Sequence, residues 1–345
     1  MSSSRSRWLR GAGAALLTFA MLTGISTAQA ESTPITVGTT PLVSSTPLFL
    51  AQGLGYWKKL GLNVKLDISA DAGTIDVATA ANSYDVSATG ITASLFNLWN
   101  SGKREYIVAD KGRIWPGQKF EALVVSNKAY SAGVKSIKAL KGKSFGDTSV
   151  GSTFDFLLGS ILQKNGLSIA DIKDTPLHTV PNLVSAVMSG QVDAAILPQP
   201  AANIALASGK VHLLTWVDSQ VKADLLVIAY SPNFVNNKPD GVKFMEGYLE
   251  AVQYYMQHVY HNHNLKDPYL LRALKIISGF AHQPQKAIMS ELIYVNPTGA
   301  VDAANAQNQL NFYLAHQYVT QKVNVKSMID NSFRQAALAA LHKKK

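Results

Sequence analysis

Two similar phrases, about one lobe apart in the chain, constrain the fold most strongly. The first is Tyr84–Gly90 (YDVSATG) and the second is Gln191–Pro200 (QVDAAILPQP); each is followed by a helical stretch, which ends at Ser101-Gly102 or at Ser208-Gly209. Each phrase predicts a buried strand led by Asp, then a small or polar turn, then a helix. Ligands of open α/β sheets bind at such carboxyl ends of strands. We therefore expect two α/β lobes that share a cleft, which indicates a binding protein rather than an enzyme with one pocket.

Residues 1–30 have the pattern of a secretory signal peptide. Three arginines and no acidic residue precede a short apolar run, and Ala28-Gln29-Ala30 gives a small-x-small cleavage pattern. The alternative, a single membrane anchor, needs a longer apolar run than this one. We expect the mature chain to begin at Glu31. Because the chain has no cysteine that could carry a lipid anchor, its expected location is the periplasm.

Composition excludes several functional classes. The absence of cysteine excludes a disulfide framework, a zinc–thiolate site and a cysteine nucleophile. The formal net charge of +10 falls to about +7 without the three leader arginines, but no basic stripe or aromatic–basic motif points to nucleic acid. The remaining positive charge mildly favours an anionic ligand. With 47% hydrophobic and 16% charged residues, a chain of this length is expected to form two globular lobes.

Strands alternate with helices in two series, which predicts parallel-rich sheets covered by helices. The first series is expected as strand 35–38, helix 47–60, strand 64–68, helix 72–81, strand 85–88, helix 92–99 and strand 106–109. The second is expected as helix 137–140, strand 144–146, helix 152–165, helix 181–189, strand 194–197, helix 200–208 and strand 211–214. Residues from about 242 to 341 are expected to form several packed helices.

The second series interrupts the first, so the second lobe is predicted to be an insertion in the first. Extended segments at 121–126 and 225–230 are expected to serve as two hinge crossings, which allow closure around a ligand. The expected domains are residues 31–122 for the first part of lobe 1, 123–227 for lobe 2, and 228–345 for the return to lobe 1 and the C-terminal helices.

Three stretches in this order carry a family resemblance: Pro47–Val64, Leu140–Gly146 with Gly151–Thr153, and Met188–Ala195. Over residues 34–230 the chain resembles the periplasmic substrate-binding proteins of ABC importers for nitrate, sulfonate, taurine and thiamine-precursor ligands, the NMT1/THI5-like group. The resemblance implies an α/β, two-lobed type II periplasmic binding protein fold with a helical C-terminal region. It also implies a monomer without cofactor, metal or catalytic residues. Such a protein delivers a solute to the permease and ATPase subunits of its transporter.

The chain departs from the common family pattern in two places, and both bear on the ligand. The loop expected at Lys111–Gly117 is aromatic and basic, whereas many members are blander there. Leu197–Pro200 lacks the aromatic and acidic residues that members often carry before the proline.

Four strand-end or helix-start segments and one loop aromatic supply the predicted ligand contacts. These contacts are Thr40, Ser44, Ser45, Thr46, Thr89, Gly90, Ile91, Thr92, Trp115, Gly151, Ser152, Thr153 and Gln199. Hydroxyls and amides at a helix start suit an anion, and Gly151–Thr153 is the strongest candidate. The structural alternative is that the hydroxyl residues simply cap helices. Gln199 offers donors and an acceptor, while Trp115 either stacks on a flat ligand or anchors its loop.

The predicted ligand is a small organic anion, namely an alkyl or aryl sulfonate or carboxylate. A neutral pyrimidine-like ring is the alternative, and it would use acids such as Asp71, Glu121 or Asp224. An exported hydrolase is a less favoured interpretation, because no nucleophile with an adjacent base is visible. Arg113 could pair with a carboxylate or remain solvated. The histidines His258, His261 and His263 either bind a metal or form a polar helix end.

Overall fold

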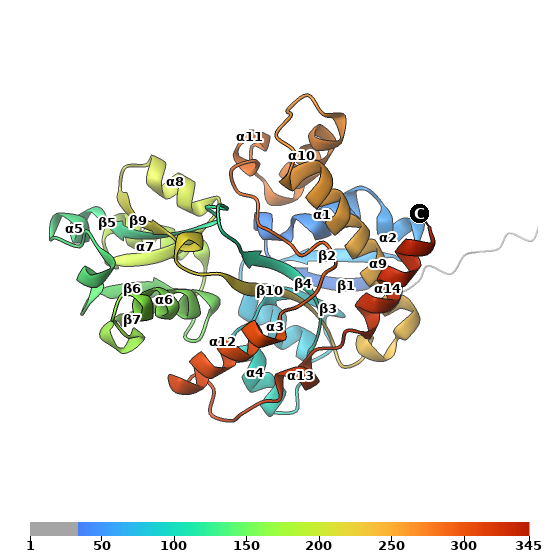
Figure 1. The fold of residues 1–345 in the computed structure, drawn as a ribbon, viewed down its shortest axis with the longest axis horizontal. Helices are drawn as coiled ribbons and strands as arrows, with labels where there is room; N and C mark the ends of the chain where they lie inside the picture. The colour runs from blue at the N-terminus through green and yellow to red at the C-terminus, as the bar shows by residue number, and fades with distance from the viewer. Residues whose placement is uncertain (1–33, 345) are drawn as a thin grey trace, which may run out of the picture. The chain divides into compact units, whose positions relative to one another are not determined.

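The computed structural model describes residues 34–344, which form one compact unit built from two α/β lobes (Figure 1). The predicted signal peptide and its cleavage site lie outside the described residues. The sheet of lobe 1 has the order β2-β1-β3-β10-β4. Its strands are β1 (Ile35–Thr39), β2 (Val64–Ile68), β3 (Val86–Gly90), β4 (Tyr106–Ile114) and β10 (Ala223–Tyr230).

The sheet of lobe 2 has the order β7-β6-β8-β5-β9. Its strands are β5 (Glu121–Ser126), β6 (Ser144–Asp147), β7 (Lys173–Pro176), β8 (Ala194–Pro198) and β9 (Val211–Trp216). All of lobe 2 lies between β4 and β10 in the chain, so the predicted insertion is confirmed. The residue boundaries proposed for the domains stay a prediction.

Helices cover both sheets, and the C-terminal third is helical as expected. In lobe 1 the helices are α1 (Thr46–Gly53), α2 (Tyr56–Lys59), α3 (Ala72–Ala80) and α4 (Ala93–Asn100), and in lobe 2 they are α5 (Asn127–Ser131), α6 (Thr153–Lys164), α7 (Val180–Ser189) and α8 (Ala201–Ala207). After β10 come α9 (Lys238–Tyr255), α10 (Pro268–Ala281), α11 (Gln285–Ile288), α12 (Ala303–Ala315), α13 (Val325–Met328) and α14 (Ser332–Lys343).

Strand register places the predicted site segments on facing edges of the two sheets. In lobe 1, β1 and β3 are parallel, and β10 begins where β3 ends, with Leu226 opposite Gly90. In lobe 2, β5 begins where β8 ends, with Glu121 opposite Pro198, and β6 runs parallel to β8. Since the connections between the lobes leave from these ends, the strand-end loops of each lobe lie on the side toward the other lobe.

Two connections cross between the lobes, and their position corrects the predicted hinge. The segments at 121–126 and 225–230 are strands β5 and β10, each with a partner on both sides in its own sheet. The crossings are the preceding residues, 115–120 and 217–222. They are joined to one another, because the amide of Gly117 donates to Asp218 Oδ2 at 2.8 Å.

Two other predicted elements need correction, and one strand was missed. The helix expected over 47–60 is two helices, because Gly55 adopts a left-handed conformation with φ of 74° between them. The strand expected to end at 109 continues to Ile114, so Lys111–Ile114 is strand rather than loop. Strand β7 was not predicted, since its sequence KDTP has no apolar pattern and it lies at the edge of the sheet.

Aromatic residues of α1 and α2 lie in the core of lobe 1. Trp57 is 1% exposed and stacks on Phe244 with 4.8 Å between ring centroids, and its indole N–H donates to the Phe244 carbonyl. Phe49 stacks on Phe280 at 5.0 Å. Helices α1 and α2 are thereby fixed against the C-terminal helices. Among residues 34–344, no helix combines the length and the hydropathy needed to span a bilayer.

Trp57→Ala should lower the free energy of unfolding by about 3–5 kcal/mol, because it removes a fully buried aromatic ring and leaves a cavity. Denaturant unfolding followed by circular dichroism measures this change. Ile204→Ala is the control, since Ile204 is 60% exposed and its truncation should cost no more than about 0.5 kcal/mol. Equal losses in the two variants would contradict the packing described here.

Candidate functional site

The starts of α4 and α6 meet where the two lobes touch. The amide of Ala93 donates to the carbonyl of Gly151 at 2.9 Å. A β-carbon on Gly90 would lie 2.7 Å from Thr153 Cγ2, so glycine is needed for this approach. The structure therefore brings together two of the predicted segments, Thr89–Thr92 and Gly151–Thr153.

The polar groups of these segments bond mainly to the protein itself. Thr92 Oγ1 caps α4 by accepting from the Leu95 amide, and Ser152 Oγ caps α6 by accepting from the amides of Phe154 and Asp155. The Gly151 amide donates to Asp155 Oδ2 at 2.6 Å. The hydroxyl groups of Thr92 and Ser152 therefore cap helices, as one interpretation of the sequence proposed. The other interpretation, that they contact a ligand, stays a prediction.

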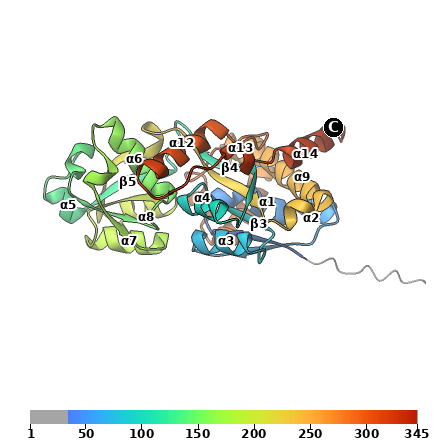
Figure 2. The same ribbon diagram turned by 90° about the horizontal axis from the view of Figure 1, so that it is seen from below.

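Helix α12 contacts both lobes beside this point (Figure 1, Figure 2). The Tyr313 hydroxyl lies 3.0 Å from the Ile91 carbonyl of lobe 1 and 3.1 Å from the Ser152 carbonyl of lobe 2. On α6, Gly159 leaves room for the ring of Phe312, which a β-carbon there would overlap. Tyr313 is fully buried. One phenol from the C-terminal region thus bridges the two strand-end loops.

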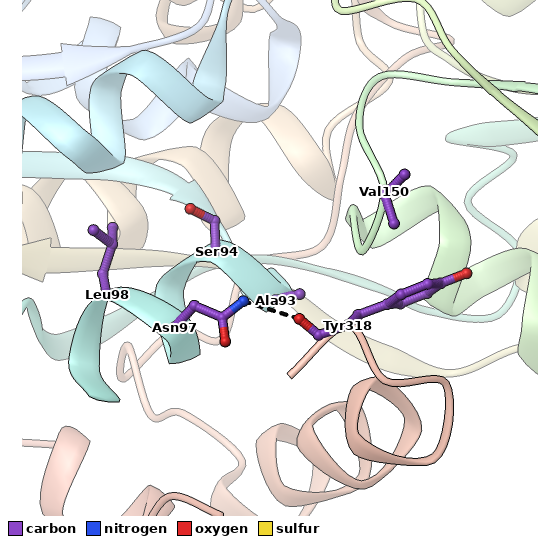
Figure 3. A pocket seen from close by; sticks show the side chains of 6 residues that line it. All are labelled: Ala93, Ser94, Asn97, Leu98, Val150 and Tyr318. Atoms are coloured by element: carbon purple, nitrogen blue, oxygen red, sulfur yellow. Dashed lines mark hydrogen bonds between the residues drawn. The ribbon is translucent and has the colours of Figure 1, made fainter. Parts of the chain in front are cut away.

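A cavity of about 360 Å³ opens beside this contact (Figure 3). Helix α4 supplies Ser94 and Asn97, lobe 2 supplies Val150, and the segment after α12 supplies Tyr318. Asn97 donates to the Tyr318 carbonyl at 2.9 Å across one side of it. Its volume lies in the range of small-molecule sites, and its lining is part polar and part apolar.

The loop after β1 lies at the same sheet edge, beside a buried ammonium group on β4. Ser45 Oγ bonds to the hydroxyl of Thr39 and donates to the carbonyl of Thr40. Ser44 Oγ is 3.5 Å from the Nζ of Lys111 on β4. Thr46 opens α1 and is fully buried, and its hydroxyl has no hydrogen-bond partner among the described residues. Two donors at this helix start, Lys111 and Thr46, thus have spare bonding capacity.

Lys111 is 1% exposed, and none of the ion pairs among residues 34–344 includes it. Burial lowers the pKa of its amine to about 7, because a charge is poorly solvated in the interior. A buried cation of this kind gains much from an anionic partner. Lys111 was not among the predicted contacts, although the sequence does place it in the basic stretch that departs from the family pattern.

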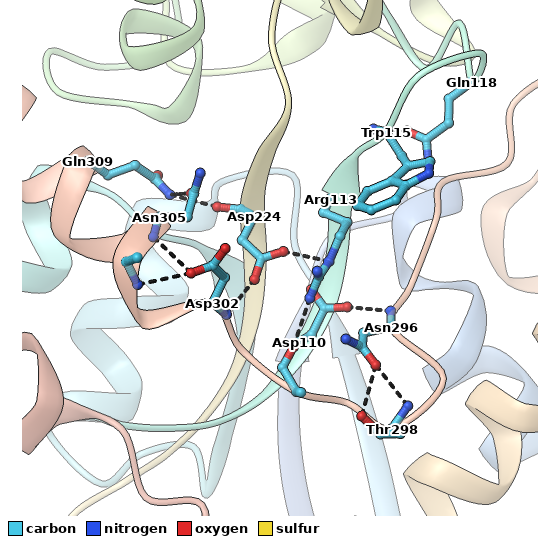
Figure 4. Close-up of polar contacts among 12 residues, drawn as sticks. Asp110, Arg113, Trp115, Gln118, Asp224, Asn296, Thr298, Asp302, Asn305 and Gln309 are labelled. Atoms are coloured by element: carbon cyan, nitrogen blue, oxygen red, sulfur yellow. Dashed lines mark hydrogen bonds and ion pairs between the residues drawn. The ribbon is translucent and has the colours of Figure 1, made fainter.

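Arg113, by contrast, is paired within the protein (Figure 4). Its Nε lies 2.5 Å from Asp224 Oδ1 and 3.6 Å from Asp110 Oδ1, and its Nη2 donates to the Ala300 carbonyl. Burial first, and then repulsion from Asp224, raises the pKa of Asp110 to about 8, while Arg113 opposes the shift. Asp224 and Arg113 thus hold one another, so neither has the free charge that the ligand hypotheses considered.

Trp115 and Gln199 lie at the first crossing. Trp115 stacks on Tyr294 with 4.9 Å between ring centroids, and Lys222 Nζ lies 3.8 Å from the Trp115 ring. Gln199 Nε2 donates to the Lys119 carbonyl. The structure thus gives both side chains anchoring contacts next to the hinge, and their predicted contact with a ligand stays a prediction.

Two buried carboxyl groups lie near the same edges. Glu121 begins β5, and burial raises its pKa to about 8. Glu291 is 1% exposed, and burial raises its pKa to about 7 against the hydrogen bond from Asn203. Each has one oxygen without a hydrogen-bond partner among the described residues. Glu291 was not predicted, and Asp71, which was considered together with Glu121 and Asp224, instead caps α3.

The histidines near the end of α9 do not gather into a metal-binding group among residues 34–344. His258 stacks on Tyr269 at 4.7 Å, and His261 contacts the ring of Tyr260.

The NMT1-like family model matches residues 28–265, which is more than half of the chain. The chain belongs to the NMT1-like family. No curated protein matches the chain.

Solved structures of similar fold are binding proteins in several cases. The chain is similar to the alkanesulfonate-binding protein SsuA from Xanthomonas axonopodis pv. citri bound to MOPS, with 20% identity, a TM-score of 0.70, and coverage of 87% of this chain and 99% of that one. It is similar to the periplasmic nitrate-binding protein NrtA from Synechocystis PCC 6803, with 15% identity, a TM-score of 0.70, and coverage of 90% and 89%. The two-lobed type II periplasmic binding protein fold is thereby confirmed.

One neighbour of this fold is an enzyme. The desulfurization enzyme DSZB has 12% identity and a TM-score of 0.63, with coverage of 89% of this chain and 99% of that one. At these identities the likeness shows the fold alone, so function must be argued from the residues of this chain.

Tyr313→Phe should destabilise the chain by about 1–3 kcal/mol, because two buried carbonyls lose their shared donor. Denaturant unfolding measures the loss. Tyr269→Phe is the control: it removes the hydroxyl group of a side chain that is 55% exposed, and it should leave stability nearly unchanged. A Tyr313→Phe variant as stable as the unsubstituted chain would show that the phenol does not bridge the lobes.

Proposed function

We propose that this protein is the solute-binding component of an ABC importer, which captures a small organic anion between its lobes and delivers it to a membrane permease. In this proposal the ligand is a sulfonate or a carboxylate, the mature chain works in the periplasm as a monomer, and no reaction is catalysed. Family membership and the fold support the transport role.

The buried ammonium group of Lys111 carries the proposal for an anion. It lies at the strand-end edge of lobe 1, beside Ser44 and near the start of α1, and no carboxylate within residues 34–344 forms an ion pair with it. The unpartnered hydroxyl of Thr46 adds a donor at the same helix start. An anion held there would neutralise the charge and accept both bonds, which makes binding worth much more than at an exposed lysine.

One lobe is not enough for high affinity. A micromolar dissociation constant corresponds to about 8 kcal/mol, whereas a helix start contributes at most about 2 kcal/mol. The remaining contacts are proposed to come from Gly90–Thr92, from Gly151–Thr153 and from Gln199, which lie at the facing edges. Apolar contact within the cleft would hold the organic part of the ligand.

A neutral pyrimidine-like ring is the second candidate, and the buried carboxyl groups of Glu121 and Glu291 favour it. Each has an unpartnered oxygen and a raised pKa, so each can donate a proton to a ring acceptor near neutral pH. A neutral ring would leave the buried ammonium group of Lys111 without a counter-charge. We therefore prefer the anion as the ligand.

A ligand screen by thermal shift and calorimetry tests the proposal. The compounds are ethanesulfonate, taurine, benzenesulfonate, benzoate, nitrate and uracil, in Tris buffer, since sulfonate buffers are themselves candidate ligands. At 100 times the dissociation constant, a true ligand stabilises the chain by about 2.7 kcal/mol. Saturable binding of a sulfonate or carboxylate without turnover supports the proposal. Binding of uracil alone would replace the anion by the ring, and chemical conversion of a bound compound would replace transport by catalysis.

Lys111→Met should weaken binding of the anion by at least about a hundredfold, because one partner of a buried ion pair is worth about 3 kcal/mol or more. The variant should fold at least as well as the parent, since it removes an unpaired buried amine. Lys65→Met is the matched control, because Lys65 is exposed on β2. Unchanged affinity in Lys111→Met would reject this site.

Binding of a sulfonate should also weaken as pH rises. In the free protein the amine of Lys111 loses its proton above about pH 7, so binding at higher pH must take up a proton. Affinity should therefore fall by up to about tenfold per pH unit from pH 7 upward, while the sulfonate itself stays charged. The contribution of Lys111 to the stability of the free chain changes in the opposite sense: because the unfolded state holds the proton up to the ordinary pKa of 10.5, this contribution rises from pH 7 toward that value. Lys111→Met should lose both trends in calorimetry and unfolding.

A further inference from the structure

Three carboxylates gather beneath the strand-end loop of lobe 2. Asp147 ends β6, Asp155 lies in the first turn of α6, and Asp174 lies on β7. One oxygen from each lies within 4.8 Å of the others. Asp147 and Asp155 are fully buried, and Asp174 is partly buried. Their chain separation means that only the folded lobe brings them together.

Part of this cluster is explained by the fold. Asp147 Oδ1 accepts from Ser152 Oγ at 2.6 Å and from the Thr148 amide at 2.5 Å. Asp155 Oδ2 accepts from the Gly151 amide at 2.6 Å. These bonds hold the loop from 147 to 152 in place and account for one oxygen of each buried carboxylate.

The hydrogen bonds of the loop do not explain the remaining carboxylate oxygens of the cluster. Asp147 Oδ2, Asp155 Oδ1 and Asp174 Oδ1 are buried and have no hydrogen-bond partner within residues 34–344. None of the ion pairs in that range includes these three residues. Unpartnered buried carboxylate oxygens are costly, and like charges at this separation repel strongly. A positive charge between them would remove both costs.

A cavity of about 260 Å³ adjoins the cluster. Asp155 and Asp174 line it, together with His316 and Tyr318. It provides room for several water molecules beside the carboxylates. Sites for hard cations are completed by water in this way, at metal–oxygen distances of about 2.3–2.6 Å for Ca²⁺. Three oxygens within 4.8 Å of one another fit around one such ion.

We propose that Asp147, Asp155 and Asp174 bind a hard divalent cation, Ca²⁺ in the first instance, through their unpartnered oxygens. An all-oxygen donor set favours Ca²⁺, Mg²⁺ or Mn²⁺ over zinc. The ion would fix the loop that ends at Ser152, whose carbonyl accepts from Tyr313. The site would therefore stiffen lobe 2 at its contact with lobe 1. It is independent of the ligand proposed above.

The competing arrangement is proton sharing. Burial first raises the pKa of both Asp147 and Asp155; repulsion from Asp174 adds to the shift of Asp147, and repulsion from Asp147 and Asp174 adds to that of Asp155. The two carboxyl groups are within hydrogen-bonding reach of one another, so a shared proton can also neutralise the pair. The two arrangements differ in their response to added cation, and a cation that displaces the proton should bind more tightly at pH 8 than at pH 6.

Calorimetry and thermal shift on the chelator-treated chain at pH 8 test the site. CaCl₂ should bind with a stoichiometry of one and raise the melting temperature saturably, and MgCl₂ and MnCl₂ should compete with it. Asp174→Asn should weaken Ca²⁺ binding by more than the roughly tenfold typical of losing an outer-shell partner. Asp240→Asn, a change of the same kind at a partly exposed position on α9, should leave it unchanged.

Asp155→Asn is the second variant. Its amide oxygen can keep the bond from the Gly151 amide, so the loop should remain folded by circular dichroism while Ca²⁺ binding is lost. Absence of saturable binding by the unsubstituted chain would leave proton sharing as the arrangement and overturn the proposal. Binding that persists unchanged in Asp155→Asn and Asp174→Asn, or binding of ZnCl₂ alone, would overturn it as well.

Discussion

The ion pairs of Arg113 fix the frame on which the proposed cleft depends. The guanidinium joins β4 to β10 through Asp224 and reaches the returning chain at the Ala300 carbonyl. The carboxylates complete the frame, because Asp110 and Asp224 accept from the amides of Asn296 and Asp302 (Figure 4). Replacing such a buried pair by apolar groups is often neutral, whereas removing one partner costs about 3–5 kcal/mol. Its value here is positional: it sets where the chain leaves lobe 1.

That position determines how the C-terminal helices reach the other lobe. Asp302 begins α12, and its amide is held by Asp224, so the helix is aimed from the lobe 1 sheet toward α6. Tyr313 then reaches the carbonyls of Ile91 and Ser152. The tail is thus part of the contact between the lobes, and it supplies a polar link that neither strand-end loop could make alone.

Sequence reasoning predicted the elements whose signals are local. Alternation of apolar residues identified β2, and the glycines at strand ends identified the starts of α4 and α6. Edge strand β7 escaped, because an edge strand that carries Lys, Asp and Pro has no apolar pattern. Lys111 escaped as a site residue because lysine is almost never fully buried unless paired, so a basic stretch is naturally assigned to a loop.

Long-range contacts were beyond the sequence for a different reason. Tyr313 lies far along the chain from both carbonyls that it bridges, and no local pattern marks it. The three aspartates likewise come from separate elements, and each alone is typical of a strand end or a helix start. Arg113 was considered for a ligand, and only the fold shows that Asp224 has already taken its charge.

The joined crossings have a consequence for the motion of the lobes. The Gly117 amide bonds to Asp218, and Lys222 lies over Trp115, so the two peptides behave as one short ribbon rather than as two independent tethers. A ribbon bends across its flat face more readily than it shears in its plane. Any opening of the lobes would then be a rotation about a single axis. Because Trp115 stacks on Tyr294 beside that axis, its fluorescence would report a change in the angle between the lobes.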